Sequence, residues 1–268
     1  MLELTDRRLA FIDLDGTLLG PDKSVSPANR HALARLRGSG VEVVIASGRH
    51  HRNIQALAID EANWVLSSHG SVVRHEPSGE LLLEMNLLPE RVTEICELAN
   101  RLEMSVIAYH RQGAYIERTS PWTELYARNA GWAPRLGEFR SLPADGFQKI
   151  IWSEDPARVE ATFAALRGDL LARYQVILND PELLEFLALG ANKGEGAKAL
   201  AARLQVDPAR TFAFGDGTND VELLRWAGVS VAMHHGRESA REAAKFVSPP
   251  GPPETALARA VDLALARG

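Results

Sequence analysis

Two aspartates stand two positions apart directly after the first apolar run of the chain. Residues 9–12 are apolar, and Asp13 and Asp15 follow them before the turn residue Gly16. A continuous apolar run that ends at a turn signal predicts a strand buried on both faces of a parallel sheet. Ligands of such sheets bind beyond the carboxyl ends of the strands. The sequence therefore predicts that both carboxylates lie at a ligand-binding edge.

The chemistry open to this pair is limited. A calcium-binding loop of the Asp-x-Asp-Gly type needs glycine at its sixth position and glutamate at its twelfth, where this chain has Leu18 and Ser24. Two carboxylates about 4 Å apart repel each other by ~4 kcal/mol at an effective dielectric constant near 20, so a hard dication or a shared proton is expected beside them. A solvated Asp-Gly turn is the alternative.

A second pair of acids follows another apolar run. Residues 211–214 predict a buried strand, and Asp216 and Asp220 come next in a glycine-containing loop. Acids four residues apart can face one site across a loop and the first turn of a helix. A hairpin at Asp-Gly is the alternative, but a hairpin needs a second strand, and residues 221–227 read as a helix. This loop therefore favours metal binding or acid/base chemistry.

Cationic and hydroxyl groups also lie at predicted element ends. Ser47-Gly48-Arg49 ends the β-branched strand 41–46, and a hydroxyl with unpaired backbone N–H groups at a helix start can bind an anion. Alternatively, Ser47 only caps the next helix. Lys193 begins a helix, where a cation opposes the macrodipole unless it meets an anion. Alternatively, Lys193 is an ordinary exposed lysine.

The composition limits the class of protein. A chain of 268 residues, 46% hydrophobic and 24% charged, has the length and balance of a soluble globular protein of one or two domains. Its net charge of −5 argues against general nucleic-acid binding. Cys96 is the only cysteine, which excludes an intrachain disulfide and favours a reducing compartment. Residues 1–8 carry two acids, and no apolar run approaches the roughly 18 residues of a membrane span. We therefore expect a cytoplasmic protein that does not enter membranes.

Strands alternate with helices at both ends of the chain. Ser26 caps a predicted helix that begins at Pro27 and stops before Gly38, and strands are predicted at 41–46 and 64–66. A last strand is expected at 229–233 and a final helix around 255–266. This alternation predicts an α/β fold with a doubly wound parallel sheet, whose strands bring polar residues to one common edge.

Residues 87–188 have a different pattern, in which hairpins dominate. This texture predicts an α+β insert between residues 1–86 and 189–268. The insert is expected to contain helices at 89–103, 121–130 and 156–167, and strands at 105–109, 115–118, 149–152, 174–178 and 183–189, the first two strands being joined by a turn at 111–113.

Four motifs occur in order, each at the end of a strand or the start of a helix. They are Asp13-Leu14-Asp15-Gly16-Thr17, Ser47-Gly48-Arg49, Lys193-Gly194 and Gly215-Asp216-Gly217-Thr218-Asn219-Asp220. With these motifs, the chain resembles the haloacid dehalogenase superfamily of phosphatases, specifically the Cof-type hydrolases of subfamily IIB, whose cap is inserted between the second and third motifs. The resemblance covers nearly the whole chain. It implies a Rossmann-like catalytic core of residues 1–86 and 189–268 and an inserted cap of residues 87–188.

The resemblance implies catalytic roles for the first three motifs. Asp13 matches the nucleophile that becomes an aspartyl phosphate, and Asp15 matches the acid/base that protonates the leaving oxygen and then activates water. Lys193 and the Ser47-Gly48-Arg49 motif match the groups that hold and neutralise the phosphoryl oxygens.

The resemblance also implies a magnesium site. Asp216 matches a metal ligand, with Asp220 and Asn219 as supporting groups, and Asn219 is counted with the phosphate-binding residues. In the family, the metal also takes a carboxylate oxygen of Asp13 and the backbone carbonyl of Asp15. A phosphate dianion cannot approach these four acids unless a cation offsets them, and hard oxygen ligands select Mg²⁺.

Two positions depart from the family pattern. Many relatives carry Asn-Gly where this chain has His69-Gly70, and Gly-Asn where it has His234-His235. An imidazole at either position is expected to pack against the cap or to hydrogen-bond a sugar hydroxyl. Adjacent histidines point in opposite directions on a strand, so a paired metal site is not expected at His234-His235.

The resemblance implies a magnesium-dependent phosphatase of small phosphorylated metabolites, with sugar phosphates as the leading substrate class. A narrower mannosyl-3-phosphoglycerate or sucrose-phosphate phosphatase is an alternative. A catalytically silent phosphometabolite-binding regulatory protein is an alternative of another class, against which the intact motifs weigh. The motifs serve any phosphomonoester, so the insert is expected to set specificity, with hinges near Asn86 and Leu189.

Overall fold

The computed structural model describes residues 7–267, which form two compact units. The first unit contains the chain up to residue 48, residues 54–83 and the chain from residue 192. The second unit contains residues 49–53 and 84–191. Residues 1–6, part of the segment predicted to contain no long apolar run, lie outside the described residues. None of the helices within residues 7–267 is long and apolar enough to cross a membrane.

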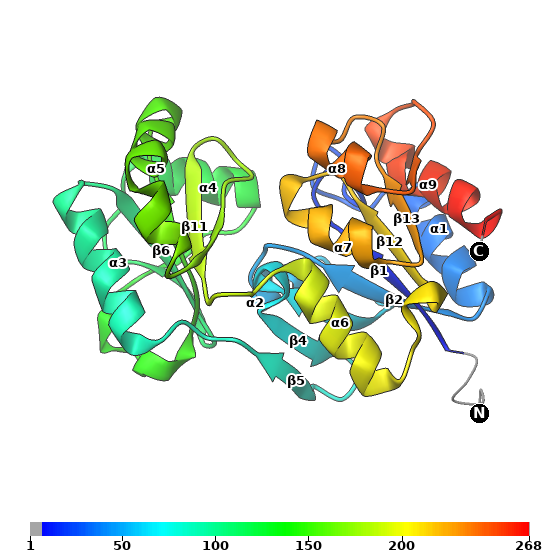
Figure 1. The fold of residues 1–268 in the computed structure, drawn as a ribbon, viewed down its shortest axis with the longest axis horizontal. Coiled ribbons are helices and arrows are strands. Elements are labelled where there is room, and N and C mark those ends of the chain that lie inside the picture. The colour runs from blue at the N-terminus through cyan, green and yellow to red at the C-terminus, as the bar shows by residue number, and fades with distance from the viewer. Residues whose placement is uncertain (1–6, 268) are drawn as a thin grey trace. The chain divides into compact units, whose positions relative to one another are not determined.

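A sheet of eight strands forms the centre of the first unit (Figure 1). In spatial order, its strands are β14 (Phe246–Val247), β13 (Val229–Ala232), β12 (Thr211–Gly215), β1 (Arg8–Ile12), β2 (Val41–Ala46), β3 (Ala62–Ser67), β4 (Val72–His75) and β5 (Leu81–Glu84). The strands from β14 to β3 pair in parallel, whereas β4 is antiparallel to β3. The predicted α/β fold with a parallel sheet is confirmed.

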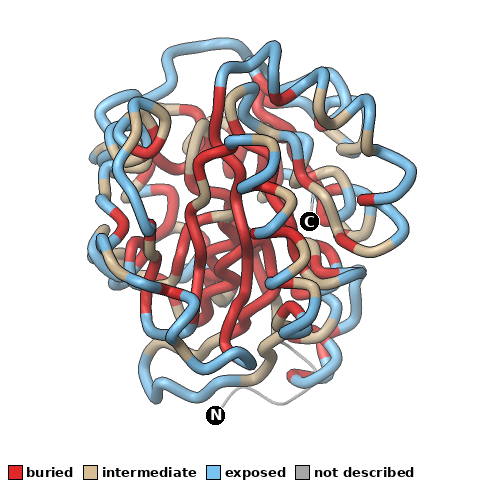
Figure 2. Tube along the Cα trace, turned by 90° about the vertical axis from the view of Figure 1, so that its left-hand side faces the viewer, coloured by how far each residue is buried: buried red, intermediate tan, exposed pale blue. Residues whose placement is uncertain are grey.

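Helices cover both faces of this sheet because its central strands are apolar on both sides. Ala10 and Ile12 of β1 face α1 (Pro27–Gly38) and α9 (Ala256–Leu265). Their neighbours Leu9 and Phe11 pack with the second layer. The helices of that layer are α6 (Lys193–Leu204), α7 (Val221–Trp226) and α8 (Glu238–Ala243). Figure 2 colours the Cα trace by burial, with buried stretches inside and exposed stretches around them.

The second unit contains a mostly antiparallel sheet of six strands. In spatial order, its strands are β10 (Gln175–Ile177), β11 (Leu183–Leu187), β9 (Phe147–Ser153), β6 (Ser105–His110), β7 (Gly113–Ile116) and β8 (Arg135–Leu136). Period-two alternation divides its faces: Ile150 and Trp152 of β9 pack with α3 (Pro89–Arg101) and α5 (Pro156–Leu171), whereas Ile151 packs with α4 (Pro121–Ala130). The short helix α2 (His51–Gln55) carries residues 51–53 of this unit.

Several predicted boundaries were wrong for local reasons. The hairpin turn has two residues, because His110 pairs with Gly113, so β7 covers Gly113–Ile116 rather than 115–118. Helix α5 passes Gly168 and ends at Leu171, because Leu170 is buried in the core of the unit. Strand β13 ends at Ala232 rather than at residue 233, and His234 and His235 lie beyond it in an exposed turn. Strands β4 and β5 were not predicted.

Candidate active site

The parallel pairing of β1 and β12 brings the two acidic loops together. Ile12 is in register with Phe214, and the backbone N–H of Asp13 donates to the carbonyl of Phe214 at 2.9 Å. Both strands therefore end at the same level of the sheet. Asp13 and the loop that contains Asp216 consequently leave the sheet side by side, as the sequence predicted for a common polar edge.

Lys193 bridges these loops from the start of α6. Its Nζ donates to Asp13 Oδ1 and to Asp220 Oδ1, each at 2.6 Å, and its side chain is fully buried. Asn192 caps the helix by accepting from the N–H of Glu195 at 2.9 Å. The alternative of an exposed lysine was wrong: the cation meets two anions, which offsets its unfavourable place at the positive end of a helix.

Burial dominates the electrostatics of this cluster. It raises the pKa of Asp13 well above its ordinary value, with Asp220 and Asp216 raising it further and Lys193 opposing the shift. Burial also raises the pKa of Asp216 to about 6, and Asp220 adds to this shift. For Lys193, burial alone would lower the pKa, but the carboxylates of Asp13 and Asp220 outweigh it and the pKa rises. The site therefore carries an excess of buried acids over cations.

The carboxylate of Asp220 shapes the loop around it. Its Oδ2 accepts from the backbone N–H of Asp216 at 3.0 Å and of Gly217 at 2.9 Å, while its Oδ1 accepts from Lys193. The hydroxyl of Thr17 donates to Asp216 Oδ1 at 2.9 Å. Asp220 thus fixes the backbone of its own loop, and Thr17 ties that loop to the first motif.

Three carboxylates of this cluster are close enough to share a cation. Oxygen atoms of Asp13, Asp216 and Asp220 all lie within 4.8 Å of one another. Carboxylate oxygens are hard ligands of the kind that Mg²⁺ prefers, and their mutual repulsion raises the pKa of two of them. The donor set therefore fits a hard divalent cation.

Asp15 is oriented differently from Asp13. Lys23 Nζ donates to Asp15 Oδ1 at 2.9 Å, and both side chains are about 40% exposed. An exposed pair of this kind contributes little stability, so its carboxylate can change partner at low cost. The Asp15 carboxylate is therefore not among the three carboxylates that could share a cation.

The second motif is divided between the two units. Ser47 is buried after β2, and its backbone N–H donates to the carbonyl of Leu66 at 2.8 Å. The next helix starts only at His51, so the alternative that Ser47 caps it was wrong. Gly48 ends a segment of the first unit, whereas Arg49 belongs to the second, where its Nη1 donates to Ala130 O at 3.0 Å.

Three residues near the cluster had no assigned role in the sequence prediction. Thr17 was quoted within its motif, and only the fold reveals its contact with Asp216. His69 was noted as a departure; its ring lies against Gly48 and Asn219 of the first unit. His235 donates from Nε2 to the carbonyl of Gly16 at 2.8 Å. The unusual residue types at positions 69 and 235 were the available signal.

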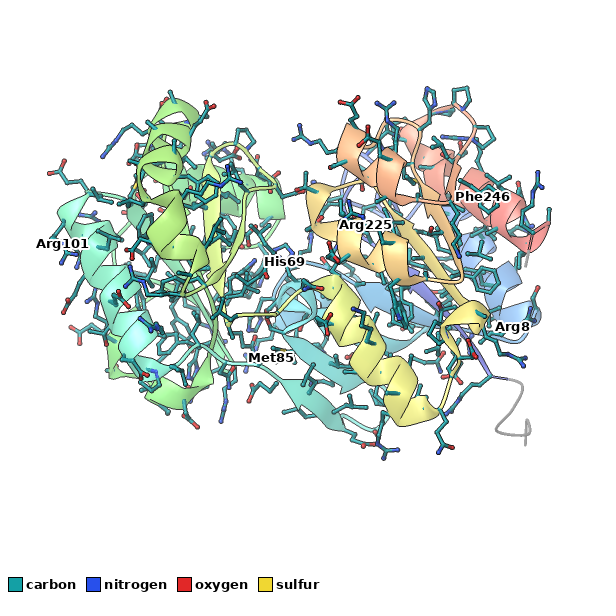
Figure 3. All side chains as sticks on the ribbon, in the orientation of Figure 1. Arg8, His69, Met85, Arg101, Arg225 and Phe246 are labelled. Carbon is teal, nitrogen blue, oxygen red and sulfur yellow. The ribbon has the colours of Figure 1, made fainter. Side chains whose placement is uncertain are left out.

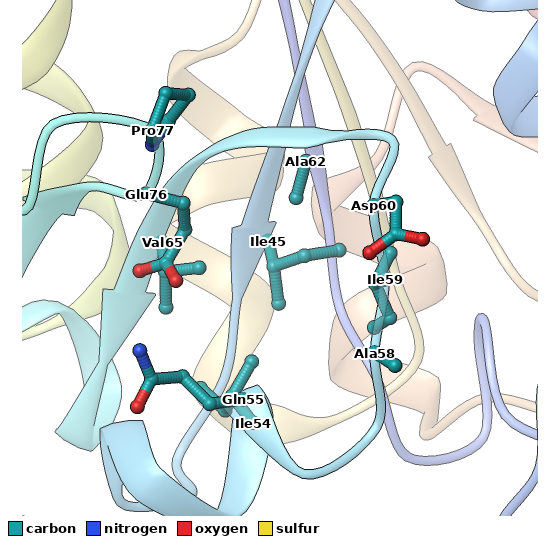
Figure 4. A pocket seen from close by; sticks show the side chains of 10 residues that line it. All are labelled: Ile45, Ile54, Gln55, Ala58, Ile59, Asp60, Ala62, Val65, Glu76 and Pro77. Carbon is teal, nitrogen blue, oxygen red and sulfur yellow. The ribbon is translucent and has the colours of Figure 1, made fainter.

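A cavity of about 350 Å³ lies elsewhere in the first unit (Figure 4). Ile45, Ile54 and Val65 contribute apolar surface to it, and Asp60 and Glu76 are its acidic lining residues. No residue of the Asp13–Lys193–Asp216–Asp220 cluster lines it. This cavity is therefore separate from the proposed chemistry.

Comparison with known proteins identifies relatives over most of the chain. A family model described as haloacid dehalogenase-like hydrolase matches residues 10–259. An "HMP-PP phosphatase" of Serratia proteamaculans is 30% identical, with 84% of this chain and 83% of that protein covered. A "Putative phosphatase YxeH" of Bacillus subtilis is 26% identical, with 89% and 92% covered. The crystal structure of a haloacid dehalogenase-like hydrolase from Bacteroides thetaiotaomicron superposes with a TM-score of 0.84 at 26% identity, covering 96% of this chain and 99% of that one.

Proposed function

The chain belongs to the haloacid dehalogenase-like hydrolase family and is a phosphatase, and we propose that it hydrolyses small phosphorylated metabolites through a phosphorylated Asp13, with Mg²⁺ as cofactor. One observation carries this proposal: Lys193 Nζ lies 2.6 Å from both Asp13 and Asp220 in a buried cluster with Asp216. In this proposal, Asp13 serves as the nucleophile, Lys193 as a fixed cation and the carboxylates as a ligand set for a divalent metal.

The proposed reaction has two displacements. A carboxylate oxygen of Asp13 attacks phosphorus while the bond from phosphorus to the ester oxygen breaks, and the leaving oxygen takes the proton of the Asp15 carboxyl group. Water then attacks phosphorus and gives a proton to Asp15, and the bond between phosphorus and Asp13 breaks. Inorganic phosphate leaves, and both aspartates return to their starting states.

Positive charge is needed for the first displacement. Lys193 favours the ionised form of Asp13 and lies where it can offset charge on the phosphoryl oxygens. One lysine cannot balance three carboxylates and a phosphate dianion. Asp13, Asp216 and Asp220 would hold Mg²⁺, together with the backbone carbonyl of Asp15. The metal would supply charge neutralisation and polarise the phosphoryl group.

We propose a class of substrates rather than one metabolite. Sugar phosphates remain the leading candidates because the family resemblance implies them. The proposed cluster recognises only the phosphoryl group and does not narrow this class further. The relative named "HMP-PP phosphatase" adds HMP-PP to the compounds to be compared. A screen should therefore include sugar phosphates, HMP-PP and an aryl phosphate under one set of conditions.

Metal dependence tests this proposal. The purified chain should release phosphate from an aryl phosphate with Mg²⁺, lose at least about 100-fold of this rate in excess chelator, and regain it when Mg²⁺ is added back. Asp13→Asn is the matched control, because it keeps the side-chain size but lacks the nucleophile. Full activity in excess chelator, or wild-type turnover by Asp13→Asn, would contradict the mechanism.

A further inference from the structure

Three consecutive residues between β3 and β4 have a left-handed backbone. Ser68, His69 and Gly70 have φ angles of 49°, 55° and 85°. Left-handed conformations are unfavourable for residues with a Cβ atom, and they persist only where the surrounding structure determines them. The sequence Ser-His is therefore held in this turn by its contacts.

The turn contacts the Ser47-Gly48 motif through both backbone and side chain. The backbone N–H of His69 donates to the carbonyl of Ser47 at 2.9 Å. The imidazole of His69 lies over Gly48 so closely that a Cβ atom at that position would come within 2.6 Å of Nε2. Because His69 is only 2% exposed, its ring has little room to give way. Residue 48 must therefore be glycine while His69 is present.

The same imidazole contacts the loop that contains Asp216 and Asp220. Asn219 Nδ2 lies 3.2 Å from His69 Nδ1. An amide nitrogen only donates, so Nδ1 accepts and carries no hydrogen, which places the ring hydrogen on Nε2. An apolar side chain of similar size would fill the space but would leave the Asn219 amide without this acceptor.

At Gly70 the turn lies against the start of α6, and Figure 3 labels His69 of the same turn. A Cβ atom on Gly70 would lie 2.5 Å from the carbonyl oxygen of Asn192 and 3.1 Å from Lys193 Cα. The backbone of the turn therefore lies directly beside the residue that caps α6 and the residue that carries the buried ammonium group. Within three residues, the turn contacts the second, third and fourth motifs.

We infer that His69 is a positioning residue: its ring fixes the Ser47-Gly48 segment relative to the loop that contains Asn219. The left-handed turn Ser68–Gly70, which packs beside Lys193, holds the ring in place. This inference rests on the proposed function, because Asn219 and Ser47 matter to it as phosphate-binding groups. Its specific content is that the imidazole acts through Asn219, and that its Nδ1 atom is the acceptor.

Variants at position 69 separate the ring from the backbone. His69→Gly tolerates the left-handed conformation and keeps the N–H bond to Ser47, but removes the imidazole. His69→Asn also tolerates this conformation and offers an oxygen near the place of Nδ1. With an aryl phosphate and saturating Mg²⁺, we expect His69→Gly to lower kcat/KM by about tenfold or more and to weaken inhibition by inorganic phosphate. His69→Asn should recover to within about threefold of wild type. His31→Ala, on the exposed side of α1, should change neither quantity.

Two double variants identify the path of the effect. If His69 acts through Asn219, His69→Gly should cost less than about twofold in an Asn219→Ala background. If the ring is what excludes a side chain at position 48, Gly48→Ala should be less harmful in the His69→Gly background than in the wild type. An equal cost of His69→Gly with and without the Asn219 side chain would show that the ring does not act through Asn219, and would overturn the inference.

A measurement independent of turnover distinguishes this inference from the proposed function. Nitrogen-resolved NMR of the histidine side chains should show His69 with a hydrogen on Nε2 and an unprotonated Nδ1, and Asn219→Ala should move the Nδ1 signal. A hydrogen on Nδ1 would overturn the inference even in an active enzyme. A wild-type chain that releases no phosphate from any screened ester would contradict the proposed function, while the NMR result would still decide the contact.

Discussion

Among the residues of the proposed site, we expect Lys193 to contribute most to the free energy of unfolding. Lys193→Met keeps the length of the side chain but leaves two buried carboxylates without their shared cation, which should lower the free energy of unfolding by about 3–5 kcal/mol. Urea unfolding in excess chelator measures this loss. Lys198→Met on the same helix is the control, because its pair with Glu195 is exposed and should contribute less than about 1 kcal/mol. Equal losses in the two variants would contradict the central position of Lys193.

Substitutions of Asp13 and Asp15 should impair different steps of the reaction. Asp13→Asn should form no phosphoenzyme at all, because the amide is no nucleophile. Asp15→Asn keeps the nucleophile but lacks the proton donor and acceptor, so turnover of an alkyl phosphate should fall by about 100-fold or more. With a good aryl leaving group, the first step needs less protonation and the second step should limit the rate. Rapid-quench trapping of the phosphoenzyme checks both roles. A phosphorylated Asp13→Asn variant would contradict the assigned roles, and so would an Asp15→Asn variant that forms no phosphoenzyme with an aryl phosphate.

Among the elements, those fixed by local pattern were the ones that sequence could predict. The β-branched run of β2, and helix α4 between Pro121 and Gly131, carry their own signals and were predicted with correct limits. Strand β4 has only four residues, two of them valines, and it pairs with β3 only after the left-handed turn at Ser68–Gly70, so its local signal was too short to predict it. The contact of Thr17 with Asp216 joins residues 199 positions apart and depends on the register of β1 with β12.

The segment that carries α2 gives the second unit a dependence on pH. His50 Nε2 donates to His110 O at 2.9 Å, while its Nδ1 accepts from the N–H of Arg52 at 3.2 Å, and its ring stacks on Trp132. Burial lowers the pKa of His50 to about 4, with His51, Arg52 and Lys149 adding to the shift and the His110 carbonyl opposing it. The neutral ring is therefore the one that fits the fold.

The sign of the pH effect follows from this lowered pKa. Between pH 4 and 6.5 the unfolded chain binds a proton at His50 and the folded chain does not, so stability falls as the pH falls. From pH 7.5 to pH 5 the loss should be about 2 kcal/mol from His50 alone. His50→Gln keeps a donor for the His110 carbonyl but cannot titrate. Urea midpoints at the two pH values should therefore differ less in this variant, and an unchanged difference would exclude His50 as the source.

At the scale of the whole chain, the division into units changes how the insert should be exchanged. Residues 49–53 follow Ser47-Gly48 in sequence but belong to the second unit. Arg49 and His50 are bonded there to backbone carbonyls of Ala130 and His110. An exchange of the insert alone would replace the carbonyl groups that the side chains of Arg49 and His50 now contact. The exchanged part should therefore contain residues 84–191 together with residues 49–53.

Exchange of this unit should move specificity without moving the chemistry. The Asp13, Lys193, Asp216 and Asp220 cluster offers charge and ligands suited to a phosphoryl group and a cation, and nothing in it can distinguish one phosphomonoester from another. A chimera that carries the second unit of a relative with another substrate should therefore change the ranking of kcat/KM among phosphorylated metabolites. A pocket contact changes kcat/KM by roughly 10–200-fold only for substrates that carry the group it touches. The Mg²⁺ dependence of the chimera and its inhibition by inorganic phosphate should therefore stay within about threefold of the parent. If a folded chimera keeps the parent's ranking, the loops of the first unit, His69 among them, must carry the discrimination.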